Sequence, residues 1–234
     1  MIKTRLSQWM EWLLVLTLPA VLVGVNLRVV TGHWLVRWEY SRPGFPADPY
    51  GLTTSERIRL ATVCQDYLAS NADISMLADL TLSNGEPAFN ERELRHMADV
   101  QAVFFGLTVV GGLSGLLWLS MGALSLTSGW MKDRYPRAIV NGSLLTLGML
   151  AVVGGFMVVS WDQFFTAFHR LFFTGDTWLF PNSDTLIRLF PIRFWIDIAA
   201  VLVGLLVVEA LALGALGLTR VRRSKAPHAF RDKG

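Results

Sequence analysis

The chain has 234 residues, of which 53% are hydrophobic, and a formal net charge of +3. Its mean hydropathy of +0.43 is too high for an ordinary water-soluble domain of this length. The basic residues gather between apolar runs rather than on one face, so no nucleic-acid partner is expected. Cys64 is the single cysteine, which excludes an intramolecular disulfide.

Four apolar runs are long enough to cross a bilayer, which takes about 20 residues. They lie at residues 12–36, 100–127, 138–160 and 194–218. Pro19 interrupts the first run, but membrane helices tolerate proline. The pattern predicts an all-α membrane protein with four transmembrane helices. In the third run, Gly154 and Gly155 are expected to permit a close helix contact.

Basic residues flank these runs on alternate sides. Cytoplasmic segments of membrane proteins carry an excess of lysine and arginine. We therefore expect both termini in the cytoplasm and the segments 33–99 and 161–193 outside it. The basic residues before the first run, between the second and third, and after the fourth are Lys3, Arg5, Lys132, Arg134, Arg137, Arg220, Arg222, Arg223, Lys225, Arg231 and Lys233.

Five segments follow from this topology. Residues 1–32 form the first transmembrane helix, and residues 33–97 a small, mostly helical extracytoplasmic cap. Residues 98–160 form the second and third membrane helices, and residues 161–193 an extracytoplasmic loop rich in aromatic residues. Residues 194–234 form the fourth helix and a basic cytoplasmic tail.

Local signals in the cap predict one helix and one turn. Thr53 and Glu56 have the spacing of a capping box, in which each residue satisfies a backbone N–H of the other at a helix start. Apolar residues recur at helical spacing after it. The Asn84-Gly85 pair predicts a short hairpin.

A second capping box, Asn90 and Glu93, opens the longest predicted helix, which continues into the second apolar run. Phe89 and Leu94 occupy the positions of a hydrophobic staple. His96 and Asp99 lie three residues apart on one face of this helix, where it meets the membrane. Asp99 could therefore orient the His96 imidazole.

The segment 161–193 places polar side chains among many aromatic ones. An aromatic belt at the membrane interface explains the aromatics. The polar groups suggest a lipid-facing pocket with a few hydrogen-bonding side chains. Asn182 or Ser183 could cap a short helix. The candidate pocket residues here are His169, Arg170, Asp176, Trp178, Asn182 and Asp184.

His96 and His169 could share the chemistry. Each is expected near the outer end of a membrane helix, and an imidazole with an ordinary pKa of about 6.5 suits proton transfer near neutral pH. Arg28, at the outer end of the first run, either extends to the interface or holds a phosphate, carboxylate or oxyanion. Glu209 lies mid-membrane in the fourth run and is left out of this site.

Motifs for other chemistries are absent from the sequence. It has no GxSxG elbow, no Walker loop, no HExxH and no paired CxxC, so no metal and no cofactor are expected. Two alternatives remain open: a non-catalytic membrane interaction protein, and a haem carrier that uses both histidines as ligands.

The chain resembles the bacterial lipoprotein intramolecular transacylases, the Lit family. Three stretches carry the resemblance: YGLTTSERIRLA (Tyr50–Ala61), ERELRHMADV (Glu91–Val100), and FHRLFFTGDTWLF with SDTLIRLFP (Phe168–Pro191). The resemblance covers most of the chain in order, and the four-span layout agrees with it.

The resemblance implies an enzyme of the bacterial cytoplasmic membrane whose active site faces outside. Its substrate is a lipoprotein whose N-terminal cysteine carries diacylglycerol, and membrane lipids surround it. The sn-2 acyl chain moves from the glycerol oxygen to the cysteine α-amine, giving the lyso form. The resemblance places the essential histidines at His96 and His169.

The residues agree with that reaction, because the substrate's amine is the nucleophile and the enzyme needs none. An α-amine with a pKa of about 8 must lose a proton, and the leaving alkoxide must gain one. We expect His169 to act as the base and His96, steadied by Asp99, as the acid; the residues alone leave the reverse assignment open. The candidate oxyanion donors are Arg28, Arg170, Asn182 and backbone N–H groups.

Overall fold

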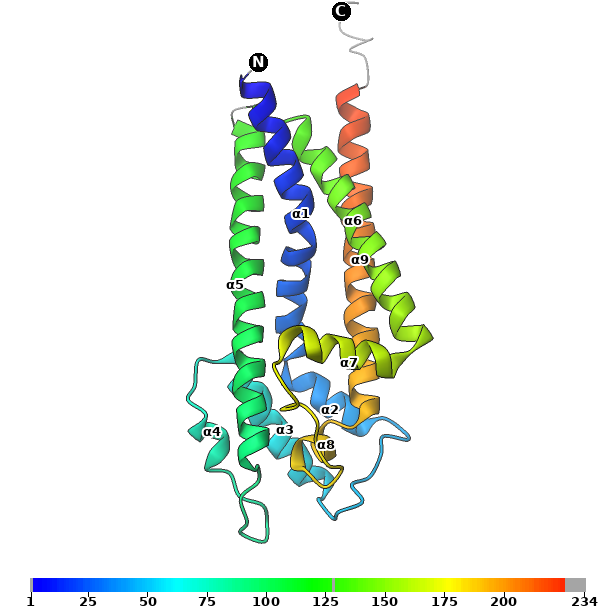
Figure 1. Cartoon of the computed structure of the whole chain (residues 1–234). Coiled ribbons are helices and arrows are strands. Elements are labelled where there is room, and N and C mark those ends of the chain that lie inside the picture. Colours follow the sequence, from blue (N-terminus) through cyan, green and yellow to red (C-terminus); the bar gives the residue numbers. More distant parts are fainter. Residues whose placement is uncertain (1, 128, 226–234) are drawn as a thin grey trace, which may run out of the picture. The chain divides into compact units, whose positions relative to one another are not determined.

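The computed structural model describes residues 2–127 and 129–225. Its described residues form helices, together with one isolated bridge between Thr81 and Pro87. Arg231 and Lys233 of the expected basic tail lie outside the described residues. The helices, coloured along the chain in Figure 1, are α1 (Ile2–Val30), α2 (His33–Ser41), α3 (Thr54–Ala69), α4 (Ser75–Ala78), α5 (Glu91–Thr127), α6 (Arg134–Val159), α7 (Trp161–Phe172), α8 (Thr185–Leu189) and α9 (Ile192–Lys225).

Four helices are long and apolar enough to cross a membrane, which confirms the predicted number of spans. They are the segments Arg5–Val30, Glu91–Thr127, Arg134–Val159 and Ile192–Arg223. Pro19 lies inside α1 without ending it. The chain is thus an all-helical, multi-pass membrane protein.

The chain divides into two compact units. The first comprises residues 1–24, 109–155 and 204–234, and contains most of the membrane-helix length. Its helices pack closely where a glycine meets a neighbouring backbone. A Cβ on Gly111 would lie 2.8 Å from the Gly24 Cα, and one on Gly217 would lie 3.0 Å from the Pro136 carbonyl oxygen.

The glycines expected at a helix contact were the wrong ones. A Cβ on Gly154 or Gly155 would meet no atom within 4 Å. A small residue permits a close contact only if it faces another helix, and composition does not show which way a residue faces.

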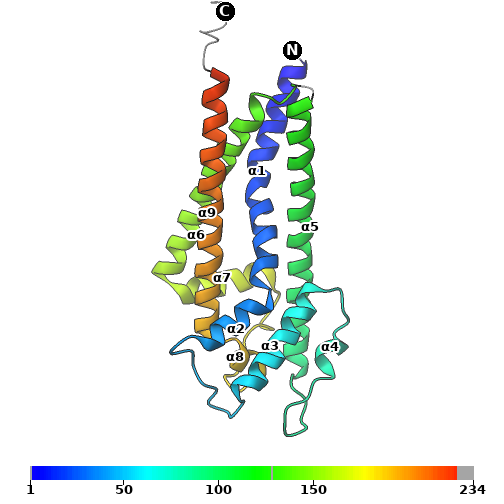
Figure 2. The ribbon, with the colours of Figure 1, turned by 180° about the vertical axis from the view of Figure 1, so that it is seen from behind.

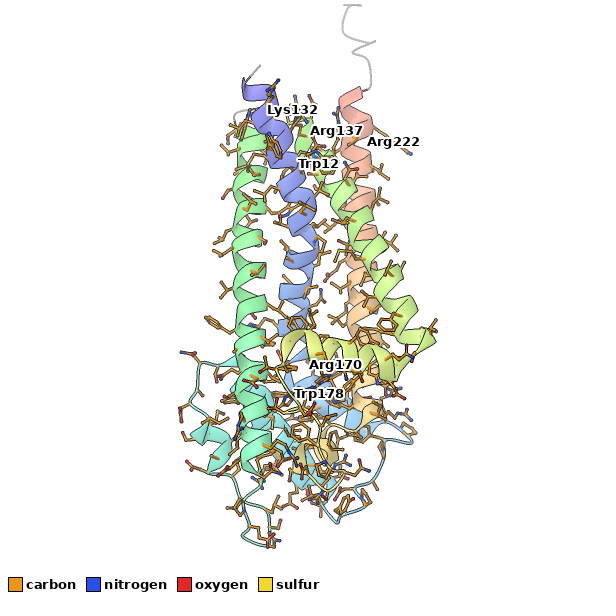
Figure 3. The ribbon with its side chains drawn as sticks, in the orientation of Figure 1. Trp12, Lys132, Arg137, Arg170, Trp178 and Arg222 are labelled. Atoms are coloured by element: carbon orange, nitrogen blue, oxygen red, sulfur yellow. The ribbon has the colours of Figure 1, made fainter. Side chains whose placement is uncertain are left out.

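Basic residues gather at one end of the first unit. Figure 3 shows Lys132, Arg137 and Arg222 at this end, near Trp12. Arg134 donates to the Glu11 carboxylate at 2.7 Å and so joins the start of α6 to α1. The predicted topology assumes that these basic residues lie on one side of the membrane, and their position at one end of the unit agrees with that assumption.

The second unit comprises residues 25–108 and 156–203. The first apolar run was expected to continue to residue 36, but α1 ends at Val30 and α2 begins at His33. Side chains beyond the break satisfy the last carbonyl groups of α1. Thr31 donates to Leu27, and the Trp34 indole donates to Val29 at 2.9 Å.

The predicted helix starts and hairpin are present in this unit. Thr53 accepts the Glu56 N–H at the start of α3, although the Glu56 carboxylate bonds to Ser83 instead of completing the box. At the start of α5 the box is complete, because Asn90 accepts from Glu93 N–H and Glu93 accepts from Asn90 N–H.

A buried cluster holds α3 against the start of α5, and the two helices lie side by side in Figures 1 and 2. Leu60, Cys64 and Met97 belong to it, and both staple residues take part. Gln101 of α5 also donates to the Tyr67 carbonyl at the end of α3. The beginning of α5 is therefore fixed by local capping and by packing.

The connection 161–193 contains two helices, α7 and α8. Asp184, rather than Asn182 or Ser183, precedes α8, and its side chain makes no capping bond. Its carboxylate accepts from Arg92 of α5 at 2.9 Å instead. Trp161 and Phe164 contact each other near the start of α7.

Candidate active site

His96 and His169 meet inside the second unit. Their ring centroids are 6.1 Å apart and their planes differ by 19°. Each residue is 9% exposed. The described structure records no hydrogen bond between the two rings, so each imidazole has a ring nitrogen available to a third group.

His169 was expected near the outer end of a membrane helix, but it lies on α7. Its Nδ1 is 2.7 Å from the Phe165 carbonyl oxygen, one helical turn earlier. A carbonyl only accepts, so Nδ1 carries the proton and the neutral ring has its lone pair on Nε2. Burial lowers the pKa of His169 below its ordinary value, which favours this neutral form.

Aromatic rings surround both imidazoles. Phe173 contacts His96 and His169, at centroid distances of 4.9 and 5.5 Å. Phe180 lies 5.3 Å from His96, and Trp178 lies 4.9 Å from His169. Both imidazoles therefore lie in apolar surroundings lined by aromatic rings. Figure 3 shows Trp178 beside α7.

His96 has an unsatisfied ring atom. Its Nδ1 is buried and has no hydrogen-bond partner within the described residues. Asp99, expected to orient it, is partly exposed and makes no recorded hydrogen bond or ion pair. The orienting role of Asp99 therefore gains no support from the geometry.

Glu93 ties α8 to the helix that carries His96. Its carboxylate is 1% exposed and accepts the Asn90 N–H at 2.8 Å and the Leu186 N–H at 2.7 Å. The tie holds the segment that leads to α8, which includes Trp178 and Phe180, against the first turns of α5.

Of the other predicted site residues, only Trp178 has a recorded contact with one of the histidine rings, that of His169, in the described part of the chain. Arg170 and Asp176 are exposed, and Figure 3 shows Arg170 on α7. Asn182 lines a separate cavity, and Asp184 is paired with Arg92.

Arg28 makes contacts of its own. It donates to the Ala69 carbonyl at 2.9 Å and lies over the Phe104 ring. Together with Ser70 and Asn71 it lines a cavity of about 170 Å³. No recorded contact joins Arg28 to either histidine.

Phe173 and Phe180 were expected only as members of the aromatic-rich segment 161–193, and Glu93 only as a capping residue. The bond from Leu186 to Glu93 spans 93 residues, and no local pattern indicates it. A weak signal existed for the phenylalanines, because both lie within the stretch that carries His169 and Trp178.

Comparisons with known proteins agree with this fold. A family model described as lipoprotein intramolecular transacylase Lit matches residues 11–195. An uncharacterized protein of Aquifex aeolicus (strain VF5) is 31% identical over 211 residues, which cover 88% of this chain and 93% of that protein.

Solved structures show the same fold. The membrane integral lipoprotein intramolecular transacylase Lit from Bacillus cereus matches with a TM-score of 0.80 and 19% identity, over 95% of this chain and 99% of that one. Two structures of that protein with a histidine replaced, by arginine and by alanine, each match with a TM-score of 0.75. The family model spans most of the chain, and the chain therefore belongs to the lipoprotein intramolecular transacylase family, Lit.

Proposed function

We propose that this protein moves the sn-2 acyl chain of a diacylglyceryl-cysteine lipoprotein onto that lipoprotein's own N-terminal α-amine. Family membership supports transacylation of a lipoprotein. The observation that carries the mechanism is the pair of buried imidazoles, His96 and His169, whose centroids lie 6.1 Å apart among aromatic rings.

The reaction balances without an enzyme nucleophile. The substrate's amine nitrogen attacks the ester carbonyl and a C–N bond forms. The ester C–O bond breaks, and the glycerol oxygen leaves with the electron pair. One proton leaves the amine and one reaches the glycerol oxygen, so the enzyme needs one group that accepts a proton and one that donates it.

His169 suits the accepting role. Its Nδ1–H is held by the Phe165 carbonyl, which leaves Nε2 as the free lone pair. Because burial lowers its pKa, the ring is neutral at neutral pH and ready to accept a proton. His96, in its protonated form, donates a proton to the departing glycerol oxygen. The proton that His169 takes from the amine then restores the starting charge of the pair.

The aromatic enclosure provides the rest of the catalysis. Amine and ester belong to one molecule, and holding them in contact converts the attack into a favourable intramolecular step. Phe173, Trp178 and Phe180 exclude water, which would otherwise hydrolyse the ester.

Mass spectrometry of a lipoprotein's N-terminal peptide tests the proposal. The host should lack other N-acylation enzymes and express the wild type, His96→Gln or His169→Asn. Wild-type protein should leave the peptide mass unchanged while one acyl chain becomes amide-linked. We expect a loss of at least 100-fold in either variant, in the range of general acid–base catalysis.

His169→Asn is a matched replacement, because its amide can keep the hydrogen bond to Phe165 while Nε2 is lost. His33→Asn, at an exposed histidine paired with Asp66, is the control that should keep full activity. Full activity in either His96→Gln or His169→Asn, with normal expression, would refute the proposed pair.

Haem ligation by the same histidines fits this arrangement poorly. The Phe173 ring contacts both imidazoles and lies where a porphyrin would need space. A Soret absorption band in the purified protein would revive that alternative, and an amine that stays free in every sample would favour a binding partner.

A further inference from the structure

A second cavity lies in the same unit, between the connection that follows α2 and the region around α8. Its volume is about 260 Å³. Pro46, Tyr50, Arg57, Asn182 and Arg188 are among the residues that line it.

One of its two arginines is already neutralised. Arg188 donates to both oxygens of Asp48, at 3.1 and 3.0 Å, and the Leu52 N–H donates to the same carboxylate at 2.6 Å. Burial acts to raise the pKa of Asp48, but these donors outweigh it and the pKa lies below its ordinary value. Asp48 and Arg188 therefore form a fixed ion pair.

Arg57 has no such partner. It is 3% exposed and donates to the Pro46 carbonyl at 2.7 Å, while its Nε has no hydrogen-bond partner within the described structure. Its guanidinium lies over the rings of Tyr40 and Phe45, at 4.7 and 5.3 Å. No carboxylate of the described residues lies within ion-pair distance of it. Asp48 on the same cavity wall is near enough to interact with Arg57 electrostatically, but its charge is already matched by Arg188.

A buried cation without an anion is costly, so the cavity favours an anionic ligand. The ring contacts hold the guanidinium plane in one orientation, which suits a planar carboxylate. Asn182 adds an amide at the cavity wall. The cavity thus combines one net positive charge with apolar walls of proline and tyrosine.

The cavity is close in the chain to the histidine pair. Phe180 contacts His96, and Asn182, two residues later, lines the cavity. Two residues span at most about 7 Å. A peptide attached to a cysteine at the histidines could therefore reach the cavity within its first few residues.

We propose that this cavity binds an acidic side chain in the peptide that follows the lipidated cysteine of the substrate. This inference rests on the proposed function for the identity of the substrate. Arg57 and Asn182 select the carboxylate, and the lipid remains at the histidines. The enzyme therefore prefers lipoproteins with an acidic residue within the first few residues after the cysteine.

Binding of N-acetylated diacylglyceryl lipopeptides, which have no free amine and cannot react, tests the inference separately from catalysis. The full-length protein in nanodiscs of zwitterionic lipid would be titrated with two peptides. One has only serine and glycine after the cysteine, and the other has glutamate at the third and fourth positions. We expect the acidic peptide to bind at least five-fold more tightly.

Two variants should remove the preference. Arg57→Met keeps the apolar stem and removes the charge. Asn182→Asp changes an exposed residue at the cavity wall, so it should fold normally even if Arg57→Met does not. Asn84→Asp in the exposed hairpin adds the same charge elsewhere and should leave the preference intact.

Equal affinity of the wild type for both peptides would overturn the inference, and so would a preference that survives Asn182→Asp. The free-amine versions of the same peptides report the proposed function. If the preference is present but these are not converted, the cavity assignment stands and the transacylase proposal fails. If the free-amine peptides are converted but the acidic peptide is not preferred, the transacylase proposal stands and the cavity assignment fails.

Discussion

The hydrogen bond from His169 Nδ1 to the Phe165 carbonyl decides which ring nitrogen of His169 keeps a free lone pair. Both residues lie on α7, so the helix backbone itself sets the tautomer. This differs from orientation of an imidazole by a carboxylate, which was expected for Asp99 beside His96, the expected acid. At the residue scale, the protein uses a backbone acceptor and burial instead of a charged partner.

The first prediction concerns the titration of His169. Because burial lowers its pKa, the ring should stay unprotonated as pH falls through 6.5 and gain its proton only at lower pH. Carbethoxylation attacks the unprotonated imidazole, so its rate at the peptide carrying His169, followed by mass spectrometry, should fall only below that pH. The denatured chain, with an ordinary pKa, is the control. A midpoint at or above 6.5 in the folded protein would contradict the burial argument.

The same shift links pH to stability. A histidine whose folded pKa is lowered contributes stability above its unfolded pKa, and this contribution is lost as pH falls from the unfolded value toward the folded one. The neutral form of the His169 imidazole therefore supports both the stability of the second unit and the tautomer that a base would need.

At the scale of elements, one carboxylate joins two segments that are distant in sequence. Glu93 completes the cap of α5 through Asn90 and accepts the Leu186 N–H of α8. Its neighbour Arg92 pairs with Asp184 at the exposed surface. Glu93 and Arg92 both link α5 to the region of α8, but the Glu93 link is buried and the Arg92 link is exposed. Replacing each residue therefore compares a buried link with an exposed one.

We predict that Glu93→Ala destabilises the protein by roughly 2–6 kcal/mol, because the buried Leu186 N–H and the partly buried Asn90 N–H lose their acceptor, at about 1–3 kcal/mol each. Thermal unfolding in detergent would measure it. Arg92→Ala, which removes an exposed ion pair, should cost no more than about 1 kcal/mol. If both variants lost the same free energy of unfolding, the buried bonds of Glu93 would contribute no more stability than the exposed ion pair of Arg92.

Helix packing in the first unit gives another element-scale prediction. A Cβ on Gly111 would meet the backbone of Gly24 and Ala20 at 2.8 and 3.0 Å, whereas one on Gly112 would meet nothing within 4 Å. Gly111→Ala should therefore separate α5 from α1 and cost about 1–3 kcal/mol, a typical overpacking penalty.

Gly112→Ala is the matched control, because it makes the same chemical change one residue along the same helix. Its melting temperature should equal or exceed that of the wild type, since alanine is the better helix former. If both variants melted at the same temperature, the close contact between α1 and α5 would carry no energetic weight.

At the scale of the whole molecule, topology determines what the enzyme can reach. The positive-inside rule predicts that the turn between α5 and α6 is cytoplasmic and that the hairpin at Asn84-Gly85 is outside. Single cysteines at Glu86 and Asp133, both exposed, test this. A membrane-impermeant maleimide applied to intact cells should label Glu86→Cys and not Asp133→Cys, and permeabilised cells should show both.

Cys64 should not interfere with that experiment. It is 1% exposed, and burial raises the pKa of its thiol, so little reactive thiolate forms. The unmodified protein, with Cys64 alone, is the background control. Labelling of Asp133→Cys in intact cells would place the candidate site on the cytoplasmic side and contradict the predicted orientation.

The sequence by itself determined the features that depend on neighbours along the chain. Apolar runs of membrane-spanning length predict four spans, because hydrophobic length needs no partner. The Asn90–Glu93 box and the staple follow from spacing within one helical turn. The break at Gly32 was missed, because the first apolar run continues across it and hydropathy alone does not show that Thr31 and Trp34 satisfy the last carbonyls of α1.

Only the tertiary structure decided which distant residues meet. It placed the His96 and His169 ring centroids 6.1 Å apart and set Phe173 and Phe180 of the aromatic-rich segment against the His96 ring. In the described part of the chain, neither the Arg28 nor the Arg170 side chain has a recorded contact with a histidine ring. The physical reason is that these contacts depend on how α7 and α8 pack against α5. That packing follows from buried partners such as Glu93 and Leu186, whose side-by-side position no local pattern encodes.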